Sequence, residues 1–121
     1  MGLCMYNEKT GKTFEIGYMG YYALRHAILE SVSKTLADEW GKIPIHETVS
    51  YYFVKKTKEL NLHDLIMLSD CNGVLDRRQV KRINKGLKNI ERVNNICNKK
   101  FQELKLFFEQ AAIEDGTIIF Y

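Results

Sequence analysis

Both ends of the chain carry short segments of β type, whereas the long stretch between them has the apolar spacing of helices. Phe14, Ile16 and Tyr18 alternate with polar or small residues, which is the period of a half-buried strand. Residues 3–7 form another short segment of this kind, and the lysine-flanked Gly11 is typical of a turn. The chain ends in TIIFY, an apolar and β-prone run that we expect to pair with this N-terminal hairpin. The two ends together therefore predict a small sheet packed against helices.

Apolar residues at helical spacing predict about five helices, over residues 21–40, 46–60, 62–69, 76–93 and 98–112. Ser50 or Thr48 is expected to cap the second helix. In the fourth, Asp76 and Gln79 have the spacing of a capping box, in which each side chain satisfies a free backbone N–H. Gly86 interrupts this helix, and an interior glycine costs about 1 kcal/mol of helix stability relative to alanine. The prediction is an α+β fold that is mostly helical.

The composition indicates a single domain over residues 1–121. Hydrophobic residues make up 45% of the chain, which is enough for an ordinary core. The three cysteines are odd in number and form no CxxC pair, which favours reduced thiols over a disulfide framework. No apolar run approaches the roughly 20 residues of a membrane span, and no signal peptide is recognised. We therefore expect a soluble, cytoplasmic protein with no membrane partner.

Residues 68–79, LSDCNGVLDRRQ, resemble a calcium-binding loop that has lost two ligands. Gly73 takes the glycine position of such a loop, and Asp70, Asn72 and Asp76 take ligand positions. The first ligand position is apolar, however, and the last holds a neutral amide. The alternative is a structural turn, in which Gly73 would adopt a left-handed conformation and Asp76 would cap the next helix. We favour the turn, with no bound metal.

Residues 77–100 contain nine lysines and arginines against a single acid and carry a net charge of +8. Seven of these bases are predicted to lie opposite the apolar stripe of the helix and are called the basic face: Arg77, Arg78, Lys81, Arg82, Lys85, Lys88 and Arg92. Such a face suits nucleic-acid phosphates or an acidic protein, and it also suits plain solvation. No aromatic residue that would stack on bases occurs within this stretch, which disfavours nucleic acid.

The chain lacks the residue patterns of the common enzyme and cofactor sites. His26, His46 and His63 are far apart in the sequence and have no metal-binding spacing. No GxSxG, P-loop or GxGxxG pattern occurs. We therefore expect a non-enzymatic protein without a cofactor.

Four short motifs give the chain a resemblance to known proteins. They are MGL at the start, YYALR at residues 21–25, SDCNG at 69–73, and FFEQAA with IIFY near the end. Their order resembles a family of small bacterial and phage proteins with a mid-chain His-Ser-Asp-Cys-Asp-Gly-like motif. Some relatives are assigned as immunity proteins of polymorphic toxin systems, which bind and silence a cognate toxin. Here Leu68 and Asn72 replace the histidine and the second aspartate of the motif, which disfavours a metal or catalytic role.

The leading hypothesis is a non-enzymatic protein-binding module of the immunity type, whose partner is a toxin. Its candidate binding residues are Ser69, Asp70, Asn72 and Gly73, because binding groups often gather on rigid turns. The alternative is a small nucleic-acid-binding or phage regulatory protein that uses the basic face. A third reading is a divalent-metal module at residues 68–79, with Asp70, Asn72 and Asp76 as ligands.

Overall fold

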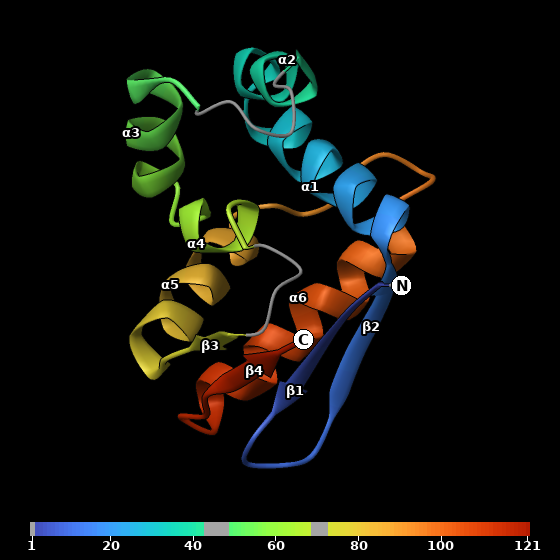
Figure 1. Cartoon of the computed structure of the whole chain (residues 1–121), viewed down its shortest axis with the longest axis vertical. Coiled ribbons are helices and arrows are strands. Elements are labelled where there is room, and N and C mark those ends of the chain that lie inside the picture. The colour runs from blue at the N-terminus through green and yellow to red at the C-terminus, as the bar shows by residue number, and fades with distance from the viewer. Residues whose placement is uncertain (1, 43–48, 69–72) are drawn as a thin grey trace.

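The computed structural model describes residues 2–42, 49–68 and 73–121 of the chain (Figure 1). Within these residues there are six helices and four strands. In chain order they are β1 (Gly2–Asn7), β2 (Thr13–Gly17), α1 (Tyr18–Val32), α2 (Lys34–Lys42), α3 (Tyr51–Glu59), α4 (His63–Ile66), β3 (Gly73–Leu75), α5 (Arg77–Lys88), α6 (Asn98–Ile113) and β4 (Ile118–Phe120). The fold is α+β and mostly helical, which confirms the predicted class.

The four strands form one antiparallel sheet in the order β2-β1-β4-β3. β1 and β2 make the predicted hairpin, in which Met5 lies opposite Phe14. The predicted C-terminal strand is β4, which pairs with β1 so that Met5 also lies opposite Phe120. The sequence prediction missed β3, because it assigned these residues to a turn. A strand of three residues is too short to show the alternating pattern by which strands are recognised.

The single helix predicted over residues 21–40 is two helices, because the backbone leaves the helical region at Ser33. Ser33 has a φ of −164° and a ψ of 115°, which are extended values. Its hydroxyl accepts a hydrogen bond from the N–H of Leu36 at 3.3 Å, and its carbonyl accepts one from Ala37 at 3.1 Å. Ser33 is therefore the N-cap of α2, a position that serine favours.

Three further predicted helices are present with shifted ends. α3 begins directly after Ser50, whose side chain accepts a hydrogen bond from the N–H of Phe53 at 3.1 Å. α4 is a short helix that buries Leu65 and Ile66, and α6 extends to Ile113. No helix within the described segments is long and apolar enough to cross a membrane.

α5 ends at Lys88 instead of continuing to residue 93. Beyond it, side chains of α6 bond to the backbone of the connecting segment. Lys105 Nζ donates to the carbonyl of Ile90 at 2.8 Å, and Gln102 Nε2 donates to the carbonyl of Glu91 at 3.0 Å. These contacts give hydrogen-bond partners to two carbonyl groups that lie beyond the end of α5.

One apolar core lies between the sheet and the helices. Phe53 of α3 and both Phe101 and Phe108 of α6 are fully buried. Met5 and Ile118 add the inner face of the sheet, and both have no exposed surface. Burying a side chain of this size contributes about 1.5–3 kcal/mol. The helices are therefore stabilised mainly by packing against this core.

Candidate functional site

Three of the four candidate binding residues, Ser69, Asp70 and Asn72, lie outside the described residues. The fourth, Gly73, begins β3 and lies opposite Phe120. The left-handed conformation predicted for Gly73 is wrong, since only Gly11 among the described glycines has a positive φ. A Cβ atom at position 73 would lie 2.4 Å from Cζ of Phe120. Close packing against this ring, rather than a turn, therefore requires glycine here.

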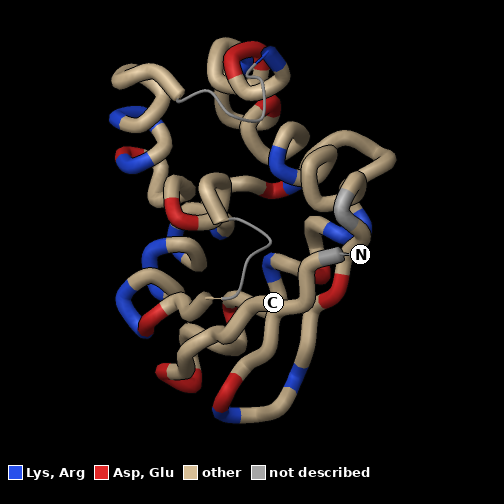
Figure 2. Tube along the Cα trace, viewed as in Figure 1, with Lys and Arg blue, Asp and Glu red and all other residues tan. Residues whose placement is uncertain are grey.

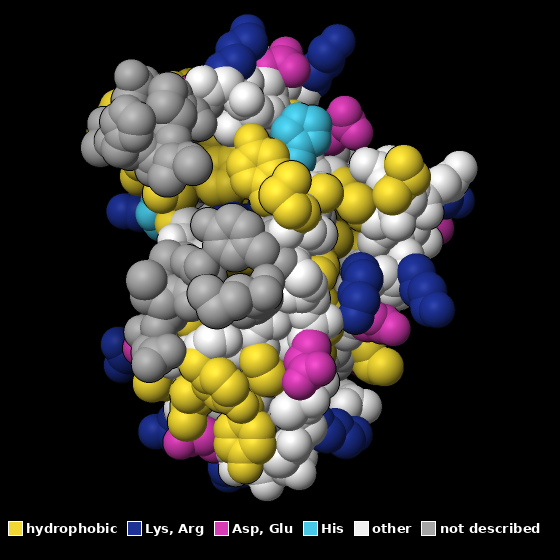
Figure 3. Space-filling view, turned by 45° about the vertical axis from the view of Figure 1, so that its right-hand side comes forward, with side chains coloured by type: hydrophobic (Ala, Val, Ile, Leu, Met, Phe, Trp, Pro, Cys, Tyr) yellow, Lys and Arg dark blue, Asp and Glu magenta, His cyan; other side chains and the backbone are white. Residues whose placement is uncertain are grey.

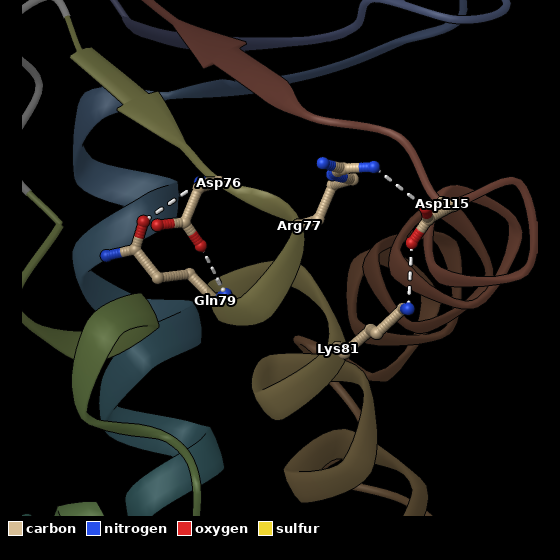
Figure 4. Close-up of polar contacts among 5 residues, drawn as sticks. All are labelled: Asp76, Arg77, Gln79, Lys81 and Asp115. Atoms are coloured by element: carbon tan, nitrogen blue, oxygen red, sulfur yellow. Dashed lines mark hydrogen bonds and ion pairs between the residues drawn. The ribbon is translucent and has the colours of Figure 1, made fainter.

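Asp76, the last metal candidate of the 68–79 segment, caps α5 (Figure 4). Its Oδ1 accepts a hydrogen bond from the N–H of Gln79 at 2.9 Å, and Oε1 of Gln79 accepts one from the N–H of Asp76 at 2.9 Å. The predicted capping box is therefore confirmed. Among the residues that the structure describes, no group of three or more His, Cys, Asp or Glu side chains is placed to hold a metal ion. Asp70 and Asn72 lie outside those residues, so the metal hypothesis stays a prediction.

One edge of the basic face is paired with Asp115, which follows α6 (Figure 4). Arg77 Nη1 lies 3.1 Å from Oδ2 of Asp115, and Lys81 Nζ lies 2.7 Å from its Oδ1. Asp115 has a φ of 55°, a left-handed conformation that aspartate tolerates better than most residues. The two bases thus connect the start of α5 with the end of α6.

The opposite edge of the basic face is paired with α4. Arg82 Nη2 lies 3.0 Å from Oδ2 of Asp64. Arg78, Lys85 and Lys88 are exposed and form no ion pair with a described acid. Figure 2 shows how the basic positions concentrate along α5. Within α5, the positive charge without an acidic partner among the described residues is therefore that of Arg78, Lys85 and Lys88.

Arg92 does not belong to this helical face, contrary to the prediction. It lies in the segment between α5 and α6, where its Nη2 donates to Oδ1 of Asn95 at 2.6 Å. The prediction placed Arg92 on the helix because the apolar spacing of Ile90 and Val93 continues the stripe of α5. Both residues are indeed buried, but from an irregular segment.

We expect replacement of Asp115 by asparagine to reduce the loss of stability at acid pH. Hydrogen bonds from Lys81 and then Arg77 hold the pKa of Asp115 below its ordinary value. A carboxyl with a depressed folded-state pKa stabilises the fold above its unfolded pKa, near 4, and loses that contribution as pH falls through the folded pKa. The wild-type protein should therefore have a larger free energy of unfolding than Asp115→Asn at about pH 6. This difference should shrink as the pH is lowered to about 2. Urea denaturation at both pH values measures this difference, and a constant value would contradict the assignment.

The outer face of the sheet carries apolar side chains that the sequence analysis did not single out. Along each strand these positions alternate with the buried ones, and they are called the outer sheet surface: Cys4, Tyr6, Val74, Ile119 and Tyr121. Tyr6 lies opposite Ile119, which in turn lies opposite Val74, so the three form a row across β1, β4 and β3. Val74 is 60% exposed and Tyr121 54% exposed. Figure 3 shows hydrophobic side chains gathered in the lower part of the molecule, where the sheet lies.

A pocket of about 430 Å³ lies on this surface, lined by Gly73, Val74, Ile119, Phe120 and Tyr121. The only sequence signal for it is the terminal IIFY run, which is apolar at every position. A sheet with one solvated face normally alternates apolar and polar residues. A run without that alternation indicates that both faces of β4 are apolar. The patch also includes Val74 of β3, a strand that the sequence did not predict.

The fold and its exposed surfaces define a small α+β domain with helices on one face of an antiparallel sheet and an apolar surface on the other. Comparison of the chain with protein families, curated proteins and solved structures finds no match. The resemblance to immunity proteins therefore stays a prediction.

Proposed function

We propose that this chain is a non-enzymatic protein-binding module whose partner docks on the outer sheet surface. One observation carries the proposal: Val74 and Tyr121, at solvent-facing positions of the sheet, are 60% and 54% exposed. Covering a large apolar side chain contributes about 1.5–3 kcal/mol, so a few such residues are enough to anchor an interface. Contiguous apolar surface on a small domain commonly marks an interaction site.

The position of the surface in the sheet also supports this proposal. Among the strands that the structure describes, β3 is an edge strand, because β4 is its only neighbour there. Edge strands are places where other chains add or dock. The partner is then a protein with an apolar patch, and the contact should persist at high salt because it depends little on exposed charge.

The finer proposal is that the partner is a toxin and the chain an immunity-type protein. The motif order described above supports it, and its central element, SDCNG, ends at Gly73, the first residue of β3. The motif therefore leads directly into the outer sheet surface. We place the protein in the cytoplasm, where unpaired thiols such as those of Cys4 and Cys97 stay reduced.

The alternative is a nucleic-acid-binding or phage regulatory protein. The observation that favours it is that Arg78, Lys85 and Lys88 of the basic face are exposed without a described acidic partner. These bases are available to phosphates. The pairing of Arg77 and Lys81 with Asp115, however, reduces the charge that remains for such contacts.

The protein-binding proposal is tested with the protein encoded by the neighbouring gene as the binding partner. We expect it to form an equimolar complex with the chain in about 1 M sodium chloride, where exposed charges are screened beyond about 3 Å. Val74→Lys should weaken this complex roughly tenfold or more, because a hot-spot residue contributes above about 1.4 kcal/mol. Isothermal titration calorimetry measures both affinities.

Leu106→Lys is the matched control, since Leu106 is 54% exposed but lies on α6. It should leave the affinity unchanged. Equal affinities for the wild-type protein and Val74→Lys would contradict the proposed surface. Binding of mixed-sequence DNA or RNA that is lost with Lys85→Glu and with rising salt would favour the alternative instead.

A further inference from the structure

A polar pocket of about 400 Å³ opens where α3, α4 and α5 meet, away from the residues that form the outer sheet surface. It is lined by Lys58, Asn61, His63, Asp64 and Arg82. The charged side chains come from three different helices, so no sequence motif marks the pocket. Its volume accommodates a small oxyanion together with several water molecules, each of which takes about 30 Å³.

The wall of this pocket is held in place by α5. Asn61 has a φ of 60°, a left-handed conformation in which asparagine is enriched. A Cβ atom at Gly86 would lie 2.6 Å from the carbonyl oxygen of Leu60 and 2.8 Å from that of Asn61. The loop before α4 therefore rests directly on the helix backbone, which fixes the position of the pocket residues that follow.

A hydrogen bond to Thr57 sets which nitrogen of His63 carries the proton. Thr57 Oγ1 lies 2.8 Å from the carbonyl oxygen of Phe53 and 3.1 Å from that of Val54. Carbonyl oxygens only accept, so these contacts take the single hydrogen of the hydroxyl. Nδ1 of His63, which lies 2.9 Å from Thr57 Oγ1, must then donate its own hydrogen to this oxygen. A neutral His63 is therefore the Nδ1–H tautomer, and its Nε2 is an acceptor.

Nε2 of His63 is available to a ligand. No described residue forms a hydrogen bond with Nε2, yet Nε2 is not one of the buried atoms that lack a partner. It is therefore exposed to solvent. Burial and then the nearby Lys58 lower the pKa of His63, and Asp64 opposes them. The ring is therefore largely neutral at pH 7 and above, with an unshared electron pair at Nε2.

Two cations line the same pocket as this acceptor. Lys58 lines the pocket from α3 and forms no ion pair with a described acid, while Arg82 lines it from α5. Arg82 uses one nitrogen on Asp64, which leaves further N–H donors of its guanidinium group free. The charges of Lys58, Arg82 and Asp64 sum to +1. The pocket therefore presents donors for a negative group. Nε2 of His63, like the side-chain oxygens of Asn61 and Asp64, can accept a hydrogen that this group carries.

We propose that the pocket binds inorganic phosphate as the hydrogen phosphate ion. Lys58 and Arg82 donate to its charged oxygens, and Nε2 of His63 accepts a hydrogen bond from its hydroxyl group. Thr57 is a positioning residue, because it keeps the proton of His63 on Nδ1. No bond forms or breaks in this binding, which is independent of the proposed docking on the outer sheet surface.

The acceptor at Nε2 gives the site a chemical preference. Hydrogen phosphate keeps a hydroxyl group near pH 8, whereas sulfate has none. A phosphate monoester above its second pKa of about 6 also lacks this hydroxyl. Bound sulfate or monoester should therefore leave Nε2 of His63 without a hydrogen-bond partner. Leaving a desolvated acceptor unpartnered costs about 1–3 kcal/mol. At lower pH, protonation of His63 turns Nε2 into a donor, and sulfate and monoester should then bind better.

The expected result at about pH 8 is that phosphate binds roughly tenfold more tightly than sulfate or methyl phosphate. Nitrogen NMR of the His63 side chain at constant ionic strength follows each titration and also reports the tautomer directly. The preference should shrink as pH falls through the lowered pKa of His63. Lys58→Gln and Arg82→Gln should each weaken phosphate binding about tenfold, as expected for the loss of a charged hydrogen bond.

Lys55→Gln is the matched control, because Lys55 is exposed on the same helix as Lys58 but does not line the pocket. It should leave phosphate affinity unchanged. Thr57→Val should move the proton of free His63 toward Nε2 and remove the preference for phosphate over sulfate. His63 signals that ignore millimolar phosphate, or equal affinities for phosphate and sulfate at pH 8, would overturn the proposal.

Discussion

Gly86→Ala is expected to destabilise the protein by about 2 kcal/mol, although the sequence pattern alone predicts the opposite sign. Alanine in a helix interior is favoured over glycine by about 1 kcal/mol. At position 86, however, the new Cβ atom would lie 2.6 Å and 2.8 Å from the carbonyl oxygens of Leu60 and Asn61. Both neighbours are backbone atoms, which no side-chain rotation can move away. Overpacking of this kind costs up to about 3 kcal/mol, so the steric effect exceeds the gain in helix propensity.

Gly41→Ala supplies the matched control for this prediction. Gly41 also lies in a helix, but among the described residues a Cβ atom there would meet only the ring of His26 at 3.8 Å, an ordinary contact. Because Gly41 has this space, its replacement should be neutral or stabilising by a few tenths of a kcal/mol. Urea denaturation of both variants gives the comparison. A Gly86→Ala protein as stable as the wild type would show that α5 does not rest on residues 60–61 in solution.

Gly73→Ala should destabilise the protein by about 1–3 kcal/mol, because the Cβ atom would overlap the ring of Phe120. The closest ring atom lies 2.4 Å from the Cβ position, and Phe120 is only 8% exposed, so the ring has little space to move. The free energy of unfolding from urea denaturation measures the effect. Gly73→Asn should be worse than Gly73→Ala, since asparagine is larger.

A double-mutant cycle with Phe120→Leu isolates the cause. Leucine lacks the outer ring atoms that the new Cβ atom would meet, so Gly73→Ala should cost less in the Phe120→Leu background by about 0.5–3 kcal/mol. If position 73 were instead left-handed, asparagine would be tolerated better than alanine, and the cost would not depend on residue 120. That result would restore the turn that the sequence suggested and remove β3 from the sheet.

The two glycine variants also bear on the two proposed surfaces. Gly86 supports the loop that holds the phosphate pocket, and Gly73 sets how closely β3 lies against β4 beneath the outer sheet surface. A variant that shifts either contact without unfolding the chain should therefore affect one surface and leave the other unchanged.

Local interactions let the sequence predict most of the elements. The capping box of Asp76 and Gln79 and the cap at Ser50 lie within four residues of the groups they satisfy, so both are visible in a short window. The hairpin and the terminal strand follow from alternation and from the need to bury TIIFY. Ser33 shows the limit of this approach, because its capping signal was present but the apolar repeat of one long helix concealed it.

The basic face and the phosphate pocket were less predictable, because their geometry depends on residues distant in the chain. Asp115 pairs with Arg77 and Lys81, and Asp64 pairs with Arg82, so the charge of the basic face depends on where α6 and α4 lie. No spacing within residues 77–100 contains that information. The same holds for the pocket, whose charged residues come from three helices.

The sequence by itself determined the α+β class, the presence of most of the helices and the pairing of the two chain ends. These follow from periodicity and from capping groups that act over a few residues. Only the tertiary structure decided the conformation of Gly73, the sign of the Gly86→Ala effect, the pairing of the basic face and the apolar outer sheet surface. Each of these depends on atoms brought together by packing of the core, and contacts between distant segments leave no pattern in either segment alone.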